Sequence, residues 1–294
     1  MSRKFQSLTT FILLFLILFC DSASARAQVI YRKLAFRDEF NRAANAPVDS
    51  SKWTAETGGG GWGNDELEYY TNSVQNAYQD GQGNLVIKAI KLTPPLNLNC
   101  WYGPCQYTSA RLITKGKFDR KYGRFEARIK IARGQGMWSA FWMLGSNIDT
   151  VGWATCGEID VMENIGREPT QVHGTIHGPG YSGANAIGAP YALPGSVRFA
   201  DDYHIFAVEW EQGEIRWYVD GKLYETRKKA DLPVGAKWVY DHPFFIILNL
   251  AVGGDWPGNP DETTAMPQTM MVDYVRAYQR ADSINPPKNS GRRR

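Results

Sequence analysis

The stretch RFEARIKI, residues 124–131, decides the fold class. Its apolar residues Phe125, Ala127, Ile129 and Ile131 take every second position, and charged residues fill all the positions between them. Successive side chains of a β-strand point to opposite faces, so a period of two predicts a strand with one face in a core and the other in water.

The same pattern and its turns recur along the chain. IRWYV, residues 215–219, is followed by Asp220-Gly221 and then Leu223, which predicts a tight hairpin. FFIILNLAV, residues 244–252, is apolar apart from Asn249, as expected of a strand covered on both faces. Because 29 glycines and 15 prolines punctuate such segments, we predict an all-β domain. Of the sandwiches and barrels that fit the pattern, we favour a jelly-roll β-sandwich.

The N-terminus has the parts of a secretory signal peptide. Arg3 and Lys4 precede an apolar run at 11–19, and small residues follow at 23–27. That run is shorter than the ~20 residues that span a membrane. We expect cleavage after Ala25 or Ala27 and a secreted or periplasmic protein.

We then expect residues 28–280 to form a single domain and residues 281–294 a disordered basic tail. Removal of residues 1–27 lowers the formal charge from +3 to +1. A near-neutral body gives no electrostatic reason to expect nucleic acid or a membrane as partner. No hydrophobic interface is legible, so we expect a monomer.

Three cysteines remain after residue 27. Cys100 and Cys105 flank the segment Trp-Tyr-Gly-Pro, and export favours a disulfide between them. Cys156 is left over, and we expect a buried, inert thiol.

The segment GEIDVMEN, residues 157–164, carries the chemistry. Glu158 and Asp160 share one face of a strand, with Ile159 opposite. Glu163 is an odd interval from Glu158, so it joins that face only if a β-bulge near Val161-Met162 adds one residue.

Three carboxyls on one face repel, so at least one should keep its proton near neutrality. A carboxylate beside a carboxylic acid is what glycoside hydrolysis requires. Two alternatives stay open: a solvated strand face that carries acids by chance, and a metal-binding cluster.

Tryptophans and histidines favour a sugar site. Several tryptophans stand beside glycine-rich loops, where indoles stack on sugar rings. Trp210 and Trp217 lie in alternating strands, and we expect them in the core. His177 either donates a hydrogen bond to substrate or to a carboxylate, or is a core histidine; for His173 we favour the core.

Taken together, these residues resemble glycoside hydrolase family 16, and within it the laminarinase-like endo-β-1,3-glucanases. The resemblance covers nearly the whole chain after the signal peptide and rests on FRDEF (36–40), GWGNDELEYYT (61–71), YTSARL (107–112), FWML (141–144), GEIDVMEN (157–164), HGTIHGPGY (173–181), NLAVGGDWPG (249–258) and VDYVR (272–276).

The resemblance implies a concanavalin A-like jelly roll with a concave cleft and retention of anomeric configuration. It makes Glu158 the nucleophile, Glu163 the general acid/base and Asp160 the assisting acid, and no cofactor is expected for catalysis. It also implies a substrate-binding set of Asn64, Arg111, Trp138, Trp153, His177 and Trp256.

Many relatives bind a structural calcium, for which the matching positions are Glu39 and Asp273. Two departures from the family pattern bear on the substrate: Glu68 replaces a frequent Gln, and Ser139 a frequent Pro.

The expected function is therefore hydrolysis of β-1,3-glucosidic bonds in a laminarin-like polysaccharide. Mixed-linkage β-1,3-1,4-glucan, agar or carrageenan is the alternative substrate, and a non-catalytic β-glucan-binding protein the alternative class.

Overall fold

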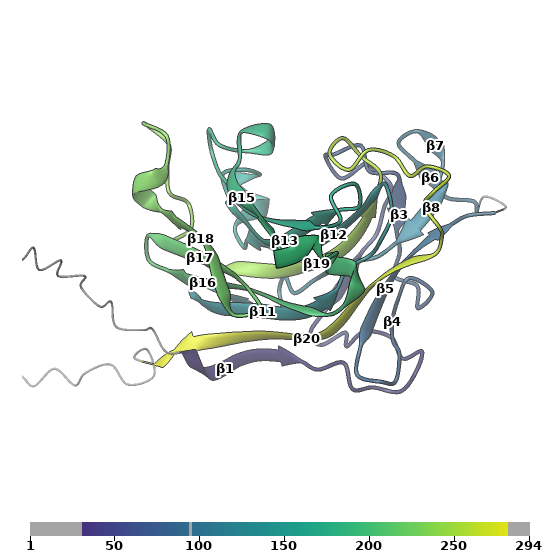
Figure 1. Ribbon diagram of the computed structural model, residues 1–294, viewed down its shortest axis with the longest axis horizontal. Helices are drawn as coiled ribbons and strands as arrows, with labels where there is room; N and C mark the ends of the chain where they lie inside the picture. The colour runs from purple at the N-terminus through teal and green to yellow at the C-terminus, as the bar shows by residue number, and fades with distance from the viewer. Residues whose placement is uncertain (1–30, 94–95, 282–294) are drawn as a thin grey trace, which may run out of the picture.

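The computed structural model describes residues 31–93 and 96–281, and strands dominate its regular structure. The predicted signal peptide and nearly all of the predicted tail lie outside the described residues. Two sheets stack face to face as a jelly-roll sandwich, with β12, β13 and β19 above β11 and β20 in the view of Figure 1.

The first sheet has ten strands among the described residues. Its path runs through β18 (Lys222–Lys228), β17 (Glu214–Val219), β16 (His204–Glu211), β11 (Gly123–Lys130), β20 (Gln268–Arg280), β5 (Leu85–Lys91), β8 (Tyr107–Ser109) and β3 (Glu68–Tyr70). Off this path, β1 (Tyr31–Asp38) pairs with β20 and β4 (Ala77–Gln79) with β5.

The second sheet carries the acidic segment. Its path runs through β15 (Ile187–Ala192), β14 (Gln171–His177), β13 (Glu158–Ile165), β12 (Met137–Gly145), β19 (Phe244–Val252), β9 (Arg111–Ile113) and β2 (Thr54–Glu56), and β10 (Asp119–Arg120) pairs with β19. β6 (Asn99–Cys100) and β7 (Gly103–Pro104) form a separate hairpin. The helical turns are short: α1 (Ile148–Val151), η1 (Gly183–Asn185), η2 (Pro194–Ser196), η3 (Phe199–Asp201) and η4 (Lys229–Asp231).

The segments that predicted the fold class behave as expected. In β11, Phe125, Ala127 and Ile129 are fully buried between the sheets. All nine residues of β19 are buried, as predicted for a strand covered on both faces. Asp220 and Gly221 join β17 to β18 with positive φ values of 49° and 77°, which suits the predicted tight hairpin. Trp210 and Trp217 lie in the core, also as predicted.

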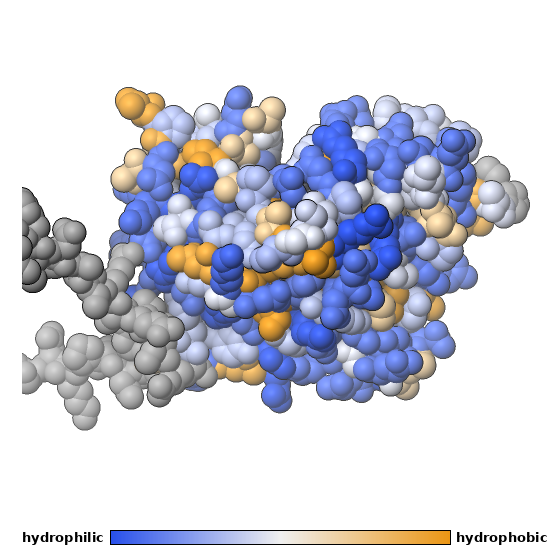
Figure 2. Space-filling view, in the orientation of Figure 1, coloured by the Kyte–Doolittle hydropathy of each residue, from blue (hydrophilic) through white to orange (hydrophobic). Residues whose placement is uncertain are grey.

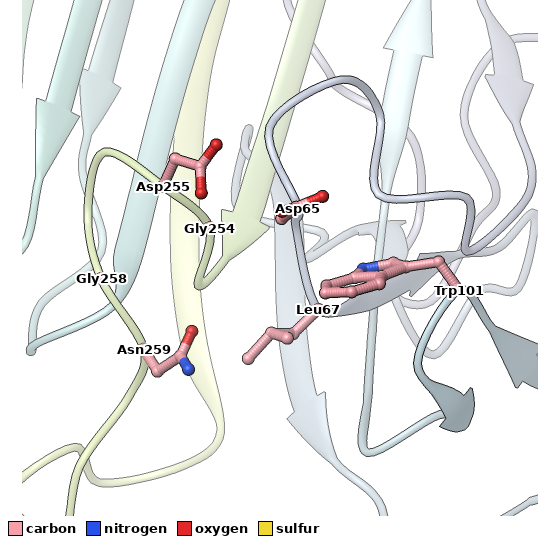
Figure 3. Close-up of a pocket in the computed structure, with 7 residues that line it drawn as sticks. All are labelled: Asp65, Leu67, Trp101, Gly254, Asp255, Gly258 and Asn259. Carbon is pink, nitrogen blue, oxygen red and sulfur yellow. The ribbon is translucent and has the colours of Figure 1, made fainter.

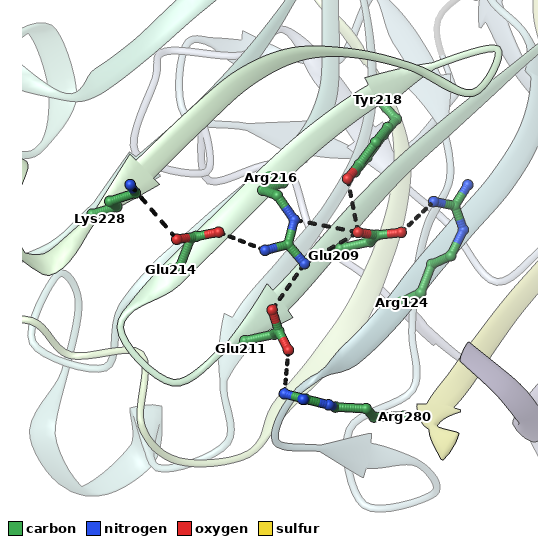
Figure 4. Close-up of polar contacts among 8 residues, drawn as sticks. All are labelled: Arg124, Glu209, Glu211, Glu214, Arg216, Tyr218, Lys228 and Arg280. Atoms are coloured by element: carbon green, nitrogen blue, oxygen red, sulfur yellow. Dashed lines mark hydrogen bonds and ion pairs between the residues drawn. The ribbon is translucent and has the colours of Figure 1, made fainter. Parts of the chain in front are cut away.

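The outer face of the first sheet holds a network of ion pairs rather than isolated charges (Figure 4). Arg216 reaches Glu209 at 3.2 Å, Glu211 at 2.9 Å and Glu214 at 2.5 Å. Arg124 and Tyr218 bind Glu209 from the other side. The network ties β11, β16 and β17 together on the side away from the core.

The outline of the molecule is indented between its two raised ends (Figure 2). One end carries β15 and the other carries β3, β6 and β7, with β13 between them (Figure 1). No helix among the described residues is long and apolar enough to cross a membrane.

Candidate active site

β13 contains the predicted bulge. Against β12, Met162 pairs with Phe141 and Asp160 with Trp142, so Val161 is the extra residue. The pairing with β14 shifts at the same place, between Asp160 and Glu163. Ile159, Val161 and Met162 are all buried in the core, and the three acids lie on the opposite face, hereafter the acid face.

Tryptophan N–H groups hold the two outer acids. Trp153 Nε1 donates to Glu158 Oε2 at 2.8 Å, and Trp138 Nε1 donates to Glu163 Oε1 at 3.1 Å. Trp153 is half exposed, at 53%, whereas the Glu158 side chain is only 14% exposed. Each donor stabilises the ionised form of its own carboxyl, so the two acids can be tuned separately.

His177 faces the acids with one defined nitrogen. Its Nδ1 accepts a hydrogen bond from the Gly183 N–H at 3.1 Å, so the proton sits on Nε2. That nitrogen lies 3.1 Å from Asp160 Oδ2 and 3.6 Å from Glu158 Oε1. Of the two predicted placements for His177, the structure therefore has the donor beside the carboxylates.

The pKa values of the three acids are shifted by different neighbouring groups. Burial and the charge of Asp160 raise the pKa of Glu158 to about 7, against the lowering effects of His177, Trp153 and Arg111. Burial, then the charges of Asp160 and Glu158, raise the pKa of Glu163 well above its usual range. Burial also raises the pKa of Asp160 well above normal. Burial thus favours the protonated form of all three acids, and the groups beside Glu158 oppose that effect there.

A hydrogen-bonded chain extends from the acid face toward β3. Trp142 Nε1 donates to Asn249 Oδ1 at 2.7 Å, and Asn249 Nδ2 donates to Tyr70 Oη at 3.1 Å. Tyr70 Oη donates to Glu66 Oε2 at 3.0 Å, and Asn64 Nδ2 donates to Glu66 Oε1 at 3.0 Å. The predicted binding residue Asn64 is thus fixed through residues distant in sequence.

Arg111, another predicted binding residue, is sandwiched between aromatic rings. Its guanidinium lies 4.8 Å from the Trp62 ring centroid and 4.7 Å from that of Trp142. It also pairs with Glu56 at 2.6 Å. Stacking and pairing leave it oriented beside the acid face.

The prediction that His173 lies in the core is wrong. Its Nε2 is 2.9 Å from Glu168 Oε2, and its ring meets the edge of Trp256 at 5.1 Å. Trp256 also meets Trp138 edge to face at 5.3 Å. His173 pairs with Glu163 in the register of β13 and β14, so it shares the acid face. The shared parity of His173 and His177 was the signal that could have placed both there.

Sequence reasoning also missed a second pair of buried acids. Glu66 is 3% exposed and Glu68 is fully buried. The Val252 N–H donates to Glu68 Oε2 at 2.7 Å, and the other oxygen of Glu68 faces Glu66. Burial and the Glu66 charge raise the pKa of Glu68 well above normal, which favours its protonated form.

The cysteines match their expected states. Cys100 and Cys105 form a disulfide. Cys156 is fully buried, and burial followed by the Glu158 charge raises the pKa of its thiol to about 11. A thiol that keeps its proton is a poor nucleophile.

The residues carried over for calcium do not fit a cation. Glu39 receives both Nε and Nη2 of Arg276, at 2.9 and 2.7 Å. Asp273 pairs with Arg128 at 2.8 Å. An arginine beside each carboxylate already supplies the positive charge, so a divalent ion would have to displace both.

A metal on the acid face was the other alternative. Glu158, Asp160 and His177 place one ligand atom each within 4.8 Å of one another. Ligand carboxyls must give up their protons, whereas burial favours the protonated form of Asp160. The arrangement suits proton transfer better than metal binding.

Comparisons with known proteins agree with this geometry. The sequence profile of glycosyl hydrolases family 16 matches residues 64–276. A glucan endo-1,3-β-glucosidase A1 of Niallia circulans is 41% identical over 261 residues, covering 83% of this chain and 37% of the relative's length. A β-glucanase of Rhodothermus marinus is 39% identical over 292 residues, covering 94% of this chain and 96% of that protein. Among solved structures, the laminarinase catalytic domain of Thermotoga maritima is similar with a TM-score of 0.78 and 50% identity, covering 84% of this chain and 98% of the other.

Proposed function

The chain belongs to glycosyl hydrolase family 16 and is a glycoside hydrolase, and on that premise we propose that it is an endo-acting β-1,3-glucanase that retains anomeric configuration. The observation that carries the assignment is the acid face of β13, on which Glu158 and Glu163 each accept an indole N–H, at 2.8 and 3.1 Å. Burial raises the pKa of both acids, and at Glu158, where it reaches about 7, His177, Trp153 and Arg111 oppose the rise.

In the first step, the Glu158 carboxylate attacks the anomeric carbon of the sugar bound over the acid face. The bond to the leaving oxygen breaks, and Glu163 transfers its proton to that oxygen. The product is a glycosyl ester on Glu158 and a shortened chain with a free hydroxyl. Trp138 N–H then stabilises the negative charge left on Glu163.

In the second step, the Glu163 carboxylate takes a proton from water as the water oxygen attacks the anomeric carbon. The ester bond breaks, and Glu158 leaves as a carboxylate that accepts the Trp153 N–H again. His177 Nε2 lies 3.1 Å from Asp160 Oδ2 and 3.6 Å from Glu158 Oε1, so His177 and Asp160 flank Glu158 and orient it through both steps. Two displacements at one carbon give net retention.

A neutral β-1,3-glucan is the substrate that these features favour. Two of the relatives named above are an endo-1,3-β-glucosidase and a laminarinase. Arg111, the cation beside the acids, is already paired with Glu56, which leaves little positive charge for a sulfated polymer. We also propose that the protein is exported by its N-terminal segment and acts as a monomer; that segment lies outside the described residues.

The first test is reducing-sugar release from laminarin, lichenan, agarose and carrageenan, measured side by side with the purified protein. We expect preferential cleavage of laminarin to short oligosaccharides, and NMR of the first products should show the β-anomer. Preference for another polymer would reject the substrate, and an initial α-anomer would reject the two-step mechanism.

The variants Glu158→Gln and Glu163→Gln then test the nucleophile and the general acid/base in turn. Both variants should fold and bind glucan. For Glu158→Gln we expect no turnover, because an amide cannot attack. Wild-type-like activity in Glu158→Gln would remove Glu158 from its role.

A further inference from the structure

A second recess lies beside the acid face, between residues 253–260 and the segment 59–67 with the β6–β7 hairpin (Figure 3). Its volume is about 390 Å³, within the range of pockets that take small ligands. We name it the Trp101 pocket, after the indole on one of its sides. Asp65 and Leu67 lie on the Trp101 side, and Asp255 and Asn259 line the other (Figure 3).

The chain holds Trp101 rigidly and yet leaves it open to solvent. Its backbone N–H donates to the Gly59 carbonyl at 2.8 Å, and its Nε1 donates to the Glu66 carbonyl at 2.8 Å. The indole nevertheless remains 51% exposed. A fixed and exposed indole offers a flat apolar surface that loses little entropy on binding.

The hairpin approaches so closely because the facing residues are glycines. A Cβ at Gly59 would lie 2.6 Å from Cys100 Sγ, and a Cβ at Gly61 would lie 3.0 Å from Trp101 Cδ1. Gly61 also has a φ of 75°, which disfavours other residues. The Cys100–Cys105 disulfide closes the hairpin on this surface. The disulfide, the two glycines and the Trp101 indole therefore pack as one unit, and the pocket lies on the outer side of this unit.

The polar groups of the pocket are available to a ligand. Asp65, Asp255 and Asn259 are exposed. Among residues 31–93 and 96–281, no side-chain hydrogen bond or ion pair of Asp65 or Asp255 is found. Carboxylates accept hydrogen bonds from sugar hydroxyls while an indole packs on the C–H face of the ring. Two acids also repel an anionic polymer, so the chemistry fits a neutral hexose.

We propose that the Trp101 pocket is a second carbohydrate site, which binds a glucosyl unit of a neutral β-glucan outside the catalytic acids. The identity of the glucan rests on the proposed function. The Asp255 N–H donates to the Asn64 carbonyl at 2.9 Å, so the pocket and the Asn64 side of the acid face share a wall. A polymer held in the pocket therefore stays near the acids between cleavage events.

The test compares a polymer with short substrates that cannot occupy both sites. For Trp101→Ala we expect KM for laminarin to rise roughly two- to tenfold, the size of one aromatic contact. Values for short β-1,3-gluco-oligosaccharides should be unchanged, and Trp101→Phe should be intermediate. Asp65→Ala probes the same pocket with an exposed side chain that makes no side-chain hydrogen bond or ion pair among the described residues, and it should also raise only the polymer KM.

Two kinetic outcomes would overturn the proposal. If Trp101→Ala and Asp65→Ala leave the polymer KM unchanged, the pocket binds no sugar. If they weaken the polymer and the oligosaccharides equally, Trp101 only supports the Asn64 segment.

Binding measured without turnover separates this proposal from the proposed function. Affinity electrophoresis of Glu158→Gln, with and without Trp101→Ala, is run in gels containing laminarin, lichenan or agarose. Retardation that depends on Trp101 supports the pocket even if the wild type cleaves no β-1,3-glucan. Retardation that does not depend on Trp101, or none in any gel, overturns it.

Discussion

Replacement of Trp153 by phenylalanine should move the acidic limb of the pH–rate profile and leave the alkaline limb in place. The phenyl ring keeps the flat surface but loses the N–H that donates to Glu158 Oε2 at 2.8 Å. That donor stabilises the Glu158 carboxylate, so its loss raises the pKa of Glu158 further. In kcat/KM, the acidic limb reports the ionisation of this carboxylate in the free enzyme.

The size of the shift follows from the exposure of the donor. A hydrogen bond to a charged group contributes about 1.5–3 kcal/mol. Trp153 is half exposed, so water replaces part of it, and we take about 1.4 kcal/mol, or one pKa unit. The acidic limb should then move from about 7 to roughly 8. At a pH of about 6, the ionised share of Glu158 falls from roughly 10% to roughly 1%, and kcat/KM falls about tenfold.

Trp138→Phe is the matched control because it deletes the N–H that donates to Glu163 Oε1. It raises the pKa of the acid that must be protonated, so it should extend the alkaline limb and leave the acidic limb in place. Both profiles are measured as kcat/KM on laminarin, with circular dichroism to confirm folding. A shift of the alkaline limb by Trp153→Phe, or of the acidic limb by Trp138→Phe, would refute the assignment of nucleophile and acid.

Three further predictions concern stability. The raised pKa of Glu68 gives stability that is complete below the unfolded value near 4.5 and is lost as pH rises toward the folded value. Glu68→Gln stays neutral and should therefore unfold at a higher temperature than wild type at pH ~9 but not at pH ~4, and equal gains at both pH values would contradict the raised pKa of Glu68. Arg216→Met removes the cation shared by three carboxylates and leaves them only their outer partners, so urea unfolding should show a loss of about 3 kcal/mol, and a neutral result would mean that Arg216 contributes nothing net to the network in Figure 4. Met162→Ala empties a fully buried position in the bulge and should destabilise the protein by about 2–5 kcal/mol by the same assay, whereas a loss below about 1 kcal/mol would show that the bulge repacks.

Local patterns predicted the parts of the fold that depend on local geometry. The alternation in 124–131 and the apolar run 244–252 identified β11 and β19, because the residues of a strand themselves determine which of its faces are buried. Counting parity from Glu158 to Glu163 also required a bulge, and the bulge lies at Val161. In each case the constraint acts within about ten residues.

The misassigned features depend on partners far along the chain. His173 contacts Trp256, and Glu68 accepts the Val252 N–H, so both have a partner far along the chain. The residues next to Glu68 do not indicate its partner, whereas the parity that His173 shares with His177 indicates its face. Glu39 and Asp273 illustrate the converse: their positions were transferred from relatives, but their arginine partners are set by this chain's own packing.

The two buried acid pairs show what turns a costly arrangement into a catalytic one. At Glu66 and Glu68, the hydrogen-bond donors are the Val252 N–H, the Tyr70 hydroxyl and the Asn64 amide, which are fixed by the fold, so the pair holds loops together. At Glu158 and Glu163, burial raises both pKa values in the same way, but each acid also has its own indole donor at a solvent-facing edge. His177 lowers the pKa of both acids, and Arg111 also lowers that of Glu158, so the surroundings of the two acids differ. The catalysis proposed for this face therefore depends on the donors and charges around the carboxyls as well as on the number of carboxyls.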